Sequence, residues 1–386
     1  MPSLFGKSLV VPKTWGIKYA GSKLKMLPHI LQILEPLIAS GEIKTVLDCF
    51  SGSTRCSQAF ASWGLSVGSN DIANYSKVVA QCFLQNTNSK EFYQPYIDIL
   101  NNLEPISGWF SQNYGIGDTK KPFQLKNMQK LDAIRPKIDE FVELDEIQKS
   151  VLLTSLLLAL DKVESTLGHF SSYLKIWSKR SYNDLFLQVP DFDSPIEAIT
   201  VSPTKQNQVF QVDAFEVVKT IPLASTSLKG RKNWDLIYLD PPYGSGNEKM
   251  PPSRIRYQAY YHFWNTVILN DKPQIFGKVG RREDSRDSNS SVFEEFRKNE
   301  NGDFLAINAV EKLIQNCNSK YVLLSYNSTG GDTQAQLFDF LKTQNVVQTL
   351  AINYKKNVMS QMTSTKQWLP TDTKYLEYLF LIQKPL

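Results

Sequence analysis

The sequence of 386 residues has few of the residues from which metal sites and disulfide frameworks are built. It contains four cysteines and three histidines, and none of the cysteines forms a Cys-x-x-Cys pair. Zinc sites and disulfide-stapled folds need cysteines or histidines at close, regular spacing. We therefore expect buried thiols, ordinary histidines and no metal cofactor.

Long apolar runs are also lacking. The longest uncharged apolar run, residues 151–160, is much shorter than the roughly 20 residues that cross a bilayer. The first residues, MPSLFGKSLVVPKTWG, have neither the long apolar core nor the small-residue cleavage site of a secretory signal. We expect no membrane span, no membrane partner and a cytoplasmic location.

The chain has no strong excess of one charge. Its net charge of +5 is compatible with a polyanionic partner but does not require one. With 42% hydrophobic and 12% aromatic residues, the chain can bury a large core. Its length predicts one large α/β domain together with a second domain or a large insertion.

Short apolar runs bounded by turn residues predict the strands of a mostly parallel sheet. Five of these runs are residues 45–47, 65–68, 209–212, 236–239 and 321–325. Two later runs, residues 347–354 and 375–383, are expected to add an antiparallel edge. The expected fold class is α/β, with a doubly wound Rossmann-like sheet. Ligands of such folds bind beyond the carboxyl ends of the strands.

A long interruption separates the second strand from the third and is too long for an ordinary loop. We expect residues 75–205 to form an inserted, mainly helical domain, and residues 1–74 and 206–386 to form the domain with the sheet. The insertion contains a strongly apolar helical stretch, residues 145–167, followed by SSYLKIWSKRSYNDLF. Basic and aromatic residues alternate in this second segment, as is typical of contacts to nucleic acid, although a solvated basic face with buried aromatics is equally compatible. The candidate contacts are Lys175, Trp177, Lys179, Arg180 and Tyr182.

The stretch YLDPPYGSG ends the fourth predicted strand with a carboxylate, two prolines and an aromatic ring. A residue before proline is kept out of helical geometry, and two prolines remove two N–H donors, so Asp240 is held extended. The Asp240 carboxylate and the Pro241 carbonyl then act as fixed acceptors, while Tyr243 follows Pro242 with a flat face. This arrangement suits an exocyclic amine on a planar heterocycle. The alternative is a proline turn in which Asp240 is a turn or cap residue.

The segment TVLDCFSGSTRCSQAF, residues 45–60, predicts a buried strand, a small-residue turn and a helix. Gly52, between Ser51 and Ser53, allows a ligand close to the backbone, with helix N-terminal amides facing an anionic group. Asp71 follows the next strand at the spacing at which α/β folds bind a ribose diol. An N-cap on the following helix is the alternative for Asp71.

Two further segments complete the candidate site. In VFQVDAF, Asp213 falls at a strand end, where it could accept a hydrogen bond from an adenine amino group with Phe215 alongside, or cap a helix. In IKYAGSKLKMLPHI, Tyr19 and Lys23 would bring a ring and a cation to a zwitterionic ligand. An ordinary solvated lysine is the alternative for Lys23.

Taken in order, KYAGSK, LDCFSGSTRC with its downstream Asp71, a long interruption, VDAF and DPPY resemble the adenine-specific DNA methyltransferases of the Dam-like, or α-group, arrangement. The resemblance spans nearly the whole chain. It implies transfer of a methyl group from S-adenosylmethionine to the N6 amine of a flipped-out adenine in double-stranded DNA, with target recognition in the insertion. It also implies a modification enzyme whose partner is a cognate restriction endonuclease.

By this resemblance, the catalytic residues are Asp240, Pro241, Pro242 and Tyr243. The implied cofactor-binding residues are Tyr19, Lys23, Asp48, Phe50, Ser51, Gly52, Ser53, Asp71, Asp213, Ala214 and Phe215. The sequence departs from the family's F-x-G-x-G pattern by placing Thr54 where a glycine is expected. The alternatives are methylation of an N4-cytosine or RNA amine by the same fold, a nicotinamide or flavin oxidoreductase, and a non-catalytic nucleic-acid-binding protein.

Overall fold

The computed structural model describes most of the chain. The described residues are 9–19, 21–115, 121–174, 176–192, 206–222, 233–242, 257–285, 291–295, 297–327, 332–354 and 375–385. Two of the predicted site residues, Lys175 and Tyr243, lie outside these ranges.

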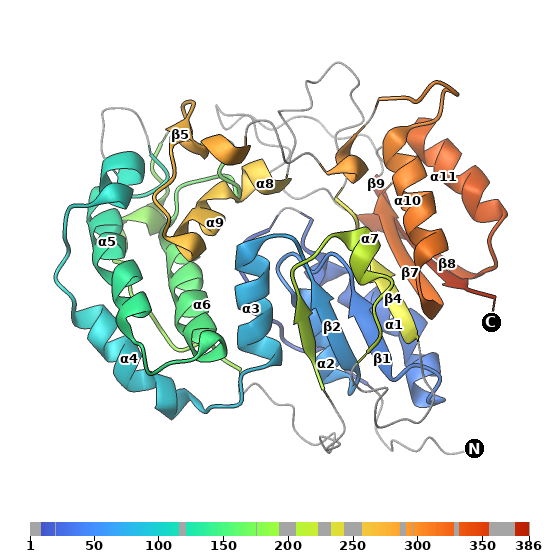
Figure 1. Cartoon of the computed structure of the whole chain (residues 1–386), viewed down its shortest axis with the longest axis horizontal. Helices are drawn as coiled ribbons and strands as arrows, with labels where there is room; N and C mark the ends of the chain where they lie inside the picture. Colours follow the sequence, from blue (N-terminus) through green and yellow to red (C-terminus); the bar gives the residue numbers. More distant parts are fainter. Residues whose placement is uncertain are drawn as a thin grey trace.

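The centre of the fold is a seven-stranded sheet with the order β3-β2-β1-β4-β7-β9-β8 (Figure 1). The strands are β1 Thr45–Asp48, β2 Ser66–Asn70, β3 Gln208–Phe210, β4 Trp234–Leu239, β7 Ser319–Asn327, β8 Val346–Tyr354 and β9 Tyr375–Gln383. The first five strands in this order are parallel, and β9 pairs antiparallel with both β7 and β8. The predicted α/β class, the mostly parallel sheet and its antiparallel edge are confirmed.

Helices cover both faces of the sheet, which explains why β1, β2 and β4 are buried along their whole length. On one face α1 (Leu27–Ala39) and α2 (Arg55–Ser62) share a core with the strands. The other face is covered by α7 (Ala214–Val217), α10 (Leu305–Asn316) and α11 (Asp332–Lys342). In α10 the buried residues recur at helical spacing, so one stripe of the helix packs on the sheet.

A helical body lies beside the sheet, at the left of Figure 1. Its helices are α4 (Lys90–Asn102), α5 (Leu125–Glu140) and α6 (Glu146–Val163), together with α8 (Tyr257–Tyr260) and α9 (His262–Leu269) from later in the chain. Helix α3 (Asn74–Leu84) stands between this body and the sheet and contributes to the cores of both. The helix predicted in residues 145–167 is α6, which begins at a capping box formed by Asp145 and Gln148.

Short elements fill the remaining segments. They are η1 (Lys23–Lys25), the π-helical turn η2 (Ser111–Gly115), η3 (Lys179–Tyr182), β5 (Ile275–Phe276), β6 (Arg281–Arg282), η6 (Glu283–Ser285) and η7 (Val292–Glu294). Among the described residues, no helix combines the length and the apolar character needed to cross a membrane. The same ranges contain no cluster of three or more His, Cys, Asp or Glu side chains suited to a metal ion. All four cysteines are free and buried.

Candidate active site

The carboxyl ends of the parallel strands open into a cavity of about 310 Å³. Asp71 follows β2, Asp213 follows β3 and Asp240 follows β4, so three turns from distant parts of the sequence meet here. The predicted site residues that line this cavity are Tyr19, Lys23, Phe50, Asp71, Asp213, Ala214, Asp240, Pro241 and Pro242. A smaller cavity of about 20 Å³ adjoins them and is lined by the predicted residues Tyr19, Lys23, Asp48, Phe50, Ser51, Gly52, Ser53 and Asp240.

The turn after β1 requires glycine at position 52. Gly52 has a φ of 50°, in the left-handed region, and a Cβ atom there would lie 3.1 Å from ring atoms of Tyr19. The Gly52 amide donates to Asp71 Oδ2 at 2.8 Å, and the Ala73 amide donates to Asp71 Oδ1 at 2.9 Å. The Asp71 carboxylate therefore ties the turn after β1 to the start of α3.

The surroundings of Thr54 explain how a threonine can stand where the family's pattern has a glycine. The φ of Thr54, 61°, is also left-handed, which is the conformation that a glycine would adopt without strain. The side chain is fully buried, and its Oγ1 accepts a hydrogen bond from Gln58 Nε2 at 2.9 Å. The backbone amide of Thr54 donates to the Ser51 carbonyl at 2.6 Å. These contacts hold a β-branched residue in a conformation that it rarely adopts.

Asp240 belongs to a chain of largely buried charges. Lys23 Nζ lies 3.0 Å from Asp240 Oδ1 and 2.7 Å from Glu377 Oε1. Ser325 Oγ donates to the same Glu377 oxygen at 2.9 Å. Burial alone would lower the pKa of Lys23, but the two carboxylates raise it above its ordinary value. Lys23 is therefore a buried, doubly paired cation rather than a solvated one.

Asp48, the last residue of β1, is completely buried. Its Oδ2 accepts a hydrogen bond of 2.6 Å from Ser57 Oγ, whereas its Oδ1 has no hydrogen-bond partner among the described residues. Burial is the largest cause that raises the pKa of Asp48 to about 7, and the charges of Asp240 and Asp71 add to it. Burial likewise raises the pKa of the Asp71 carboxyl.

Aromatic rings form the apolar walls. The ring of Phe50 meets that of Phe293 edge-on at 5.2 Å, and the Phe215 ring stacks on Phe293 at 5.7 Å. Phe215 itself does not line the cavity, although Ala214 does. On the other side Tyr19 stacks on Tyr261, with ring centroids 4.5 Å apart.

Asp213 caps a helix, as the alternative interpretation of this residue predicted. It is the N-cap of α7, and its Oδ1 accepts a hydrogen bond from the Phe215 amide at 2.8 Å. It is also exposed and lines the cavity, so capping leaves it accessible to a ligand.

Several residues of the site were not predicted from the sequence, and five of them bring a ring or a charge to the large cavity or to Lys23. They are Tyr75, Tyr257, Phe293 and Glu294, which line the large cavity, and Glu377, which pairs with Lys23. Their sequence neighbourhoods carry no recognisable motif, and only their three-dimensional neighbours reveal them.

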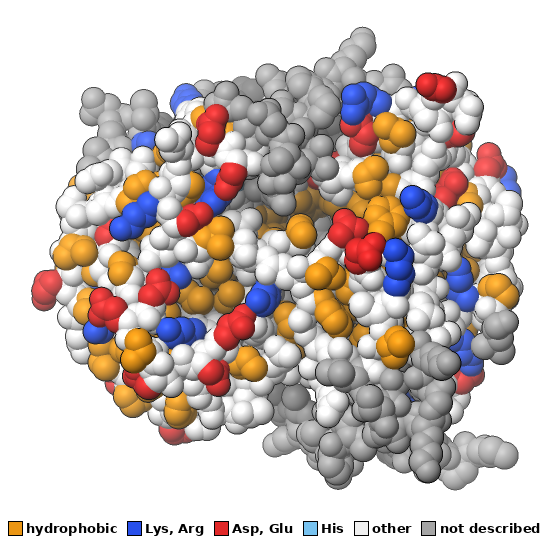
Figure 2. Space-filling view, viewed as in Figure 1, with side chains coloured by type: hydrophobic (Ala, Val, Ile, Leu, Met, Phe, Trp, Pro, Cys, Tyr) orange, Lys and Arg blue, Asp and Glu red, His pale blue; other side chains and the backbone are white. Residues whose placement is uncertain are grey.

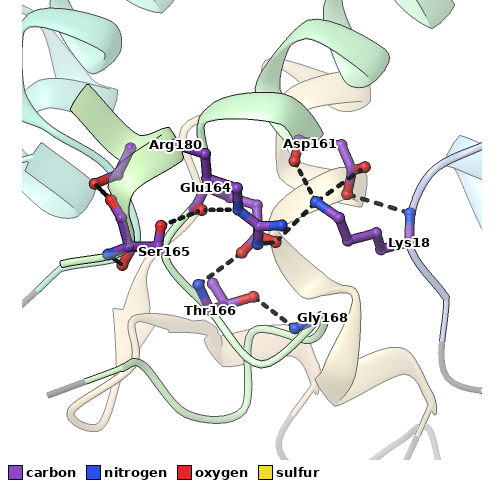
Figure 3. A network of polar contacts seen from close by, with 9 residues as sticks. Lys18, Asp161, Glu164, Ser165, Thr166, Gly168 and Arg180 are labelled. Carbon is purple, nitrogen blue, oxygen red and sulfur yellow. Dashed lines mark hydrogen bonds and ion pairs between the residues drawn. The ribbon is translucent and has the colours of Figure 1, made fainter. Parts of the chain in front are cut away.

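The predicted nucleic-acid contacts differ in their surroundings. Lys179 and Tyr182, in η3, are exposed, and Trp177 is half-buried. Arg180 instead joins an internal polar network, shown in Figure 3, where its guanidinium pairs with Glu164 and its Nε donates to the Glu164 carbonyl at 2.8 Å. The Glu164 side chain is only 2% exposed. None of these residues lines the cavity.

The same network anchors the segment that carries Tyr19. The Lys18 amide donates to Asp161 Oδ1 at 3.2 Å, and Lys18 Nζ donates to the Asp161 carbonyl at 2.8 Å (Figure 3). Lys18 Nζ also lies 3.6 Å from Glu164 Oε1. The carboxyl end of α6 therefore connects the Arg180 segment to the wall of the cavity.

Charges on the face seen in Figure 2 are mixed. Lys and Arg side chains are interspersed with Asp and Glu over both the helical body and the half with the sheet, and do not form one basic patch. On this face, contacts to a polyanion would depend on particular basic residues rather than on a broad positive field.

Comparison with known proteins relates this chain to DNA-modifying enzymes. The family model for the D12 class N6 adenine-specific DNA methyltransferases matches residues 19–295, which include Tyr19, Lys23, the Gly52 turn, Asp71, Asp213 and the Asp240 corner. Modification methylase StsI of Streptococcus sanguinis is 29% identical over 389 residues, covering 95% of this chain and 52% of that protein. Type II methyltransferase M.NlaIII of Neisseria lactamica is 28% identical, covering 95% of this chain and 99% of that protein. Type II methyltransferase M.FokI of Planomicrobium okeanokoites is 25% identical, covering 96% and 53%. The chain thus spans about half the length of two of these relatives and nearly all of the third.

Proposed function

Because the chain belongs to the D12 class N6 adenine-specific DNA methyltransferases, we propose that it transfers the methyl group of S-adenosylmethionine to the exocyclic N6 amine of an adenine in double-stranded DNA. One observation carries the proposal. The Asp240–Pro241–Pro242 corner at the end of β4 lines the large cavity together with Asp71 and Phe50, and Asp240 and Phe50 also line the small cavity together with the Gly52 turn. A target amine and a methyl donor can therefore meet at Asp240, where the two cavities adjoin.

The residues around the cavity fit S-adenosylmethionine. A volume of about 310 Å³ is at the lower end of the ~300–1,000 Å³ that small-molecule sites occupy. Asp71 would hold the ribose hydroxyls and Asp213 the adenine amino group, with Phe50 and Ala214 at the apolar wall. The backbone amides of Ser51, Gly52 and Ser53 lie near the expected methionine end.

The small cavity supports this orientation of the cofactor. It is lined by Asp48, whose buried Oδ1 has no hydrogen-bond partner among the described residues. A buried acceptor without a donor is costly, and the ammonium group of the methionine end would satisfy it. Tyr19 and Lys23 line the same space. When bound, S-adenosylmethionine supplies an activated methyl group on a positively charged sulfur.

The protein's own contribution is mainly alignment, because the methyl donor is already activated. The Asp240 carboxylate and the Pro241 carbonyl would accept the two N–H bonds of the adenine amine and direct its lone pair toward the methyl carbon. After transfer, Asp240 would accept the proton that the amine loses. Stacking of the target base on Tyr243 stays a prediction, because this residue lies outside the described residues.

An adenine inside a duplex cannot reach Asp240, whose side chain is only 15% exposed at the end of β4. The base must leave the stack, at a cost of a few kcal/mol. We propose that target recognition belongs to residues 75–205, with Lys175, Trp177, Lys179 and Tyr182 as DNA contacts. For Arg180 we propose that it holds this segment in shape through Glu164 in addition to any contact with DNA.

The biological role follows from the relatives, which are named as modification methylases and Type II methyltransferases. We propose that this chain protects DNA as the modification arm of a restriction-modification system, with a cognate endonuclease as its functional partner. Since the proposed substrate is the cell's own DNA, the proposed place of action is the cytoplasm.

The test is an assay with the purified protein, methyl-labelled S-adenosylmethionine and duplex DNA of mixed sequence, followed by chromatography of the DNA hydrolysate. We expect N6-methyladenine, and Asp240→Ala should lower the single-turnover rate by about a hundredfold to ten-thousandfold while cofactor binding survives. Asp339→Ala is the matched control, because Asp339 is an exposed carboxylate on α11. N4-methylcytosine, label in RNA alone, or an unchanged rate in Asp240→Ala would contradict the proposal.

A further inference from the structure

The buried charges around Lys23 reach beyond the DPPY corner to β9. Glu377, Lys23 and Asp240 follow one another in space, although 354 residues separate Lys23 from Glu377 in the sequence. Their side chains are 7%, 8% and 15% exposed, respectively. The Ser325 hydroxyl on β7 donates to Glu377 and fixes its carboxylate from the other side.

Lys23 pairs with two carboxylates, although one is enough to balance the charge of a buried ammonium. A buried ion pair costs desolvation that its Coulomb attraction only partly offsets, so a second buried carboxylate beside Lys23 needs a reason. The long, flexible stem of lysine does not set the position of its ammonium by itself. Glu377 does this, because it holds Lys23 Nζ at 2.7 Å from a rigid, paired strand.

We propose that Glu377 is a positioning residue for methyl transfer, which holds the Lys23 ammonium so that Lys23 in turn fixes the Asp240 carboxylate toward the target amine. The proposal rests on the methyltransferase function proposed above. Glu377 does not line the large cavity and acts only through Lys23. By sharing the positive charge of Lys23, Glu377 also keeps Asp240 a strong hydrogen-bond acceptor for the amine.

Lys23 is the group whose titration reports on this arrangement. Asp240 and Glu377 hold the pKa of Lys23 above its ordinary value. The other titratable side chains that line the small cavity with Lys23 are Tyr19, Asp48, Arg55, Cys56 and Tyr238. Tyr257, which the charges of Asp240 and Glu377 also reach, lines the large cavity. Replacing Glu377 by glutamine removes one of the two charges that raise the pKa. Lys23 should then lose its proton at a lower pH than in the unmodified protein.

The experiment compares Glu377→Gln with the unmodified protein in single-turnover methylation of DNA from pH 6 to 10, with cofactor affinity measured in parallel. We expect a rate at least tenfold lower at pH 7.5 and a dissociation constant for S-adenosylmethionine within threefold. Because the pKa of Lys23 is raised above its ordinary value, the alkaline limb of the unmodified protein lies above pH 10, and we expect it to move into the measured range in Glu377→Gln. Glu377→Asp keeps the charge and should keep the alkaline limb. The matched control is Glu42→Gln, which removes a Lys–Glu pair with Lys320 at the opposite ends of the strands.

A normal rate in Glu377→Gln overturns the proposal, and so does a lower rate with an unmoved alkaline limb, because that pattern indicates a purely structural role. If Glu377→Gln fails to fold, Ser325→Ala replaces it in the test, because this variant removes only the hydroxyl that orients Glu377. We expect Ser325→Ala to lower the methylation rate by less than Glu377→Gln would. An unchanged rate in Ser325→Ala overturns the proposal. Failure of the methyltransferase function itself is a separate result: the unmodified protein would then produce no N6-methyladenine.

Discussion

Replacement of Gly52 by alanine tests how the turn after β1 forms the cofactor site. Gly52 has a φ of 50°, and alanine in this left-handed region costs roughly 1–2 kcal/mol of unfolding free energy. The new Cβ would also lie 3.1 Å from Cε1 and Cζ of Tyr19. That ring cannot move away, because it is stacked on Tyr261 with centroids 4.5 Å apart. The turn itself must therefore shift.

A shifted turn weakens the hydrogen bond of 2.8 Å from the Gly52 amide to Asp71. A hydrogen bond to a charged group is worth about 1.5–3 kcal/mol, and about 1.4 kcal/mol corresponds to a tenfold change in affinity. We expect Gly52→Ala to raise the dissociation constant for S-adenosylmethionine by about tenfold or more. Isothermal titration calorimetry gives this constant, and urea denaturation gives the free energy of unfolding.

Gly41→Ala is the matched control. Gly41 has a φ of 74°, but its nearest neighbour for a new Cβ is the flexible end of Lys44 at 3.6 Å, and it follows α1 far from the cavity. Both variants should lose about 1–2 kcal/mol of stability from backbone strain, and only Gly52→Ala should lose cofactor affinity. Equal dissociation constants in the two variants would refute the role assigned to the turn.

Two further predictions concern buried charges. Arg180→Ala leaves Glu164 with fewer partners and should lower the free energy of unfolding by roughly 2 kcal/mol. Lys179→Ala should change the free energy of unfolding by less than about 0.5 kcal/mol and reduce the salt dependence of DNA binding by about one ion. Equal losses of stability in urea denaturation would contradict the network of Figure 3. Burial raises the pKa of Asp48 from its ordinary 3.8 to about 7. The folded state therefore holds this proton more tightly than the unfolded state does. The proton's contribution to the free energy of unfolding is fully present near pH 4 and is lost as the pH rises through 7. Between pH 5 and 8 the unmodified protein should therefore lose about 2–3 kcal/mol relative to Asp48→Asn, and parallel stability curves for the two proteins would show that Asp48 is ionised throughout.

The sheet and many of the residues that line its cavities were predictable from local sequence. Strands buried on both faces must be short apolar runs, and turn residues bound them, so the parallel strands and the antiparallel edge could be predicted. The small residues around Gly52 likewise predicted a turn, and Gly52 there has a φ of 50°. The ends of the strands in the structure differ from the predicted ends by up to two residues, as in β2 and β3. The reason is that pairing with neighbouring strands, rather than composition, decides where a strand ends.

Only the tertiary structure decided which charges and rings meet. Glu377 pairs with Lys23 across nearly the whole chain, and Phe293 packs on Phe50 and Phe215, because the sheet order brings separate segments to one edge. Arg180 was predicted as a DNA contact because it stands among basic and aromatic residues, and only the structure shows that its guanidinium also pairs with the buried Glu164. A local pattern specifies the conformation and the chemical character of a segment. Its partners follow from burial, which penalises every unpaired charge and thereby selects contacts between residues that are distant in the sequence.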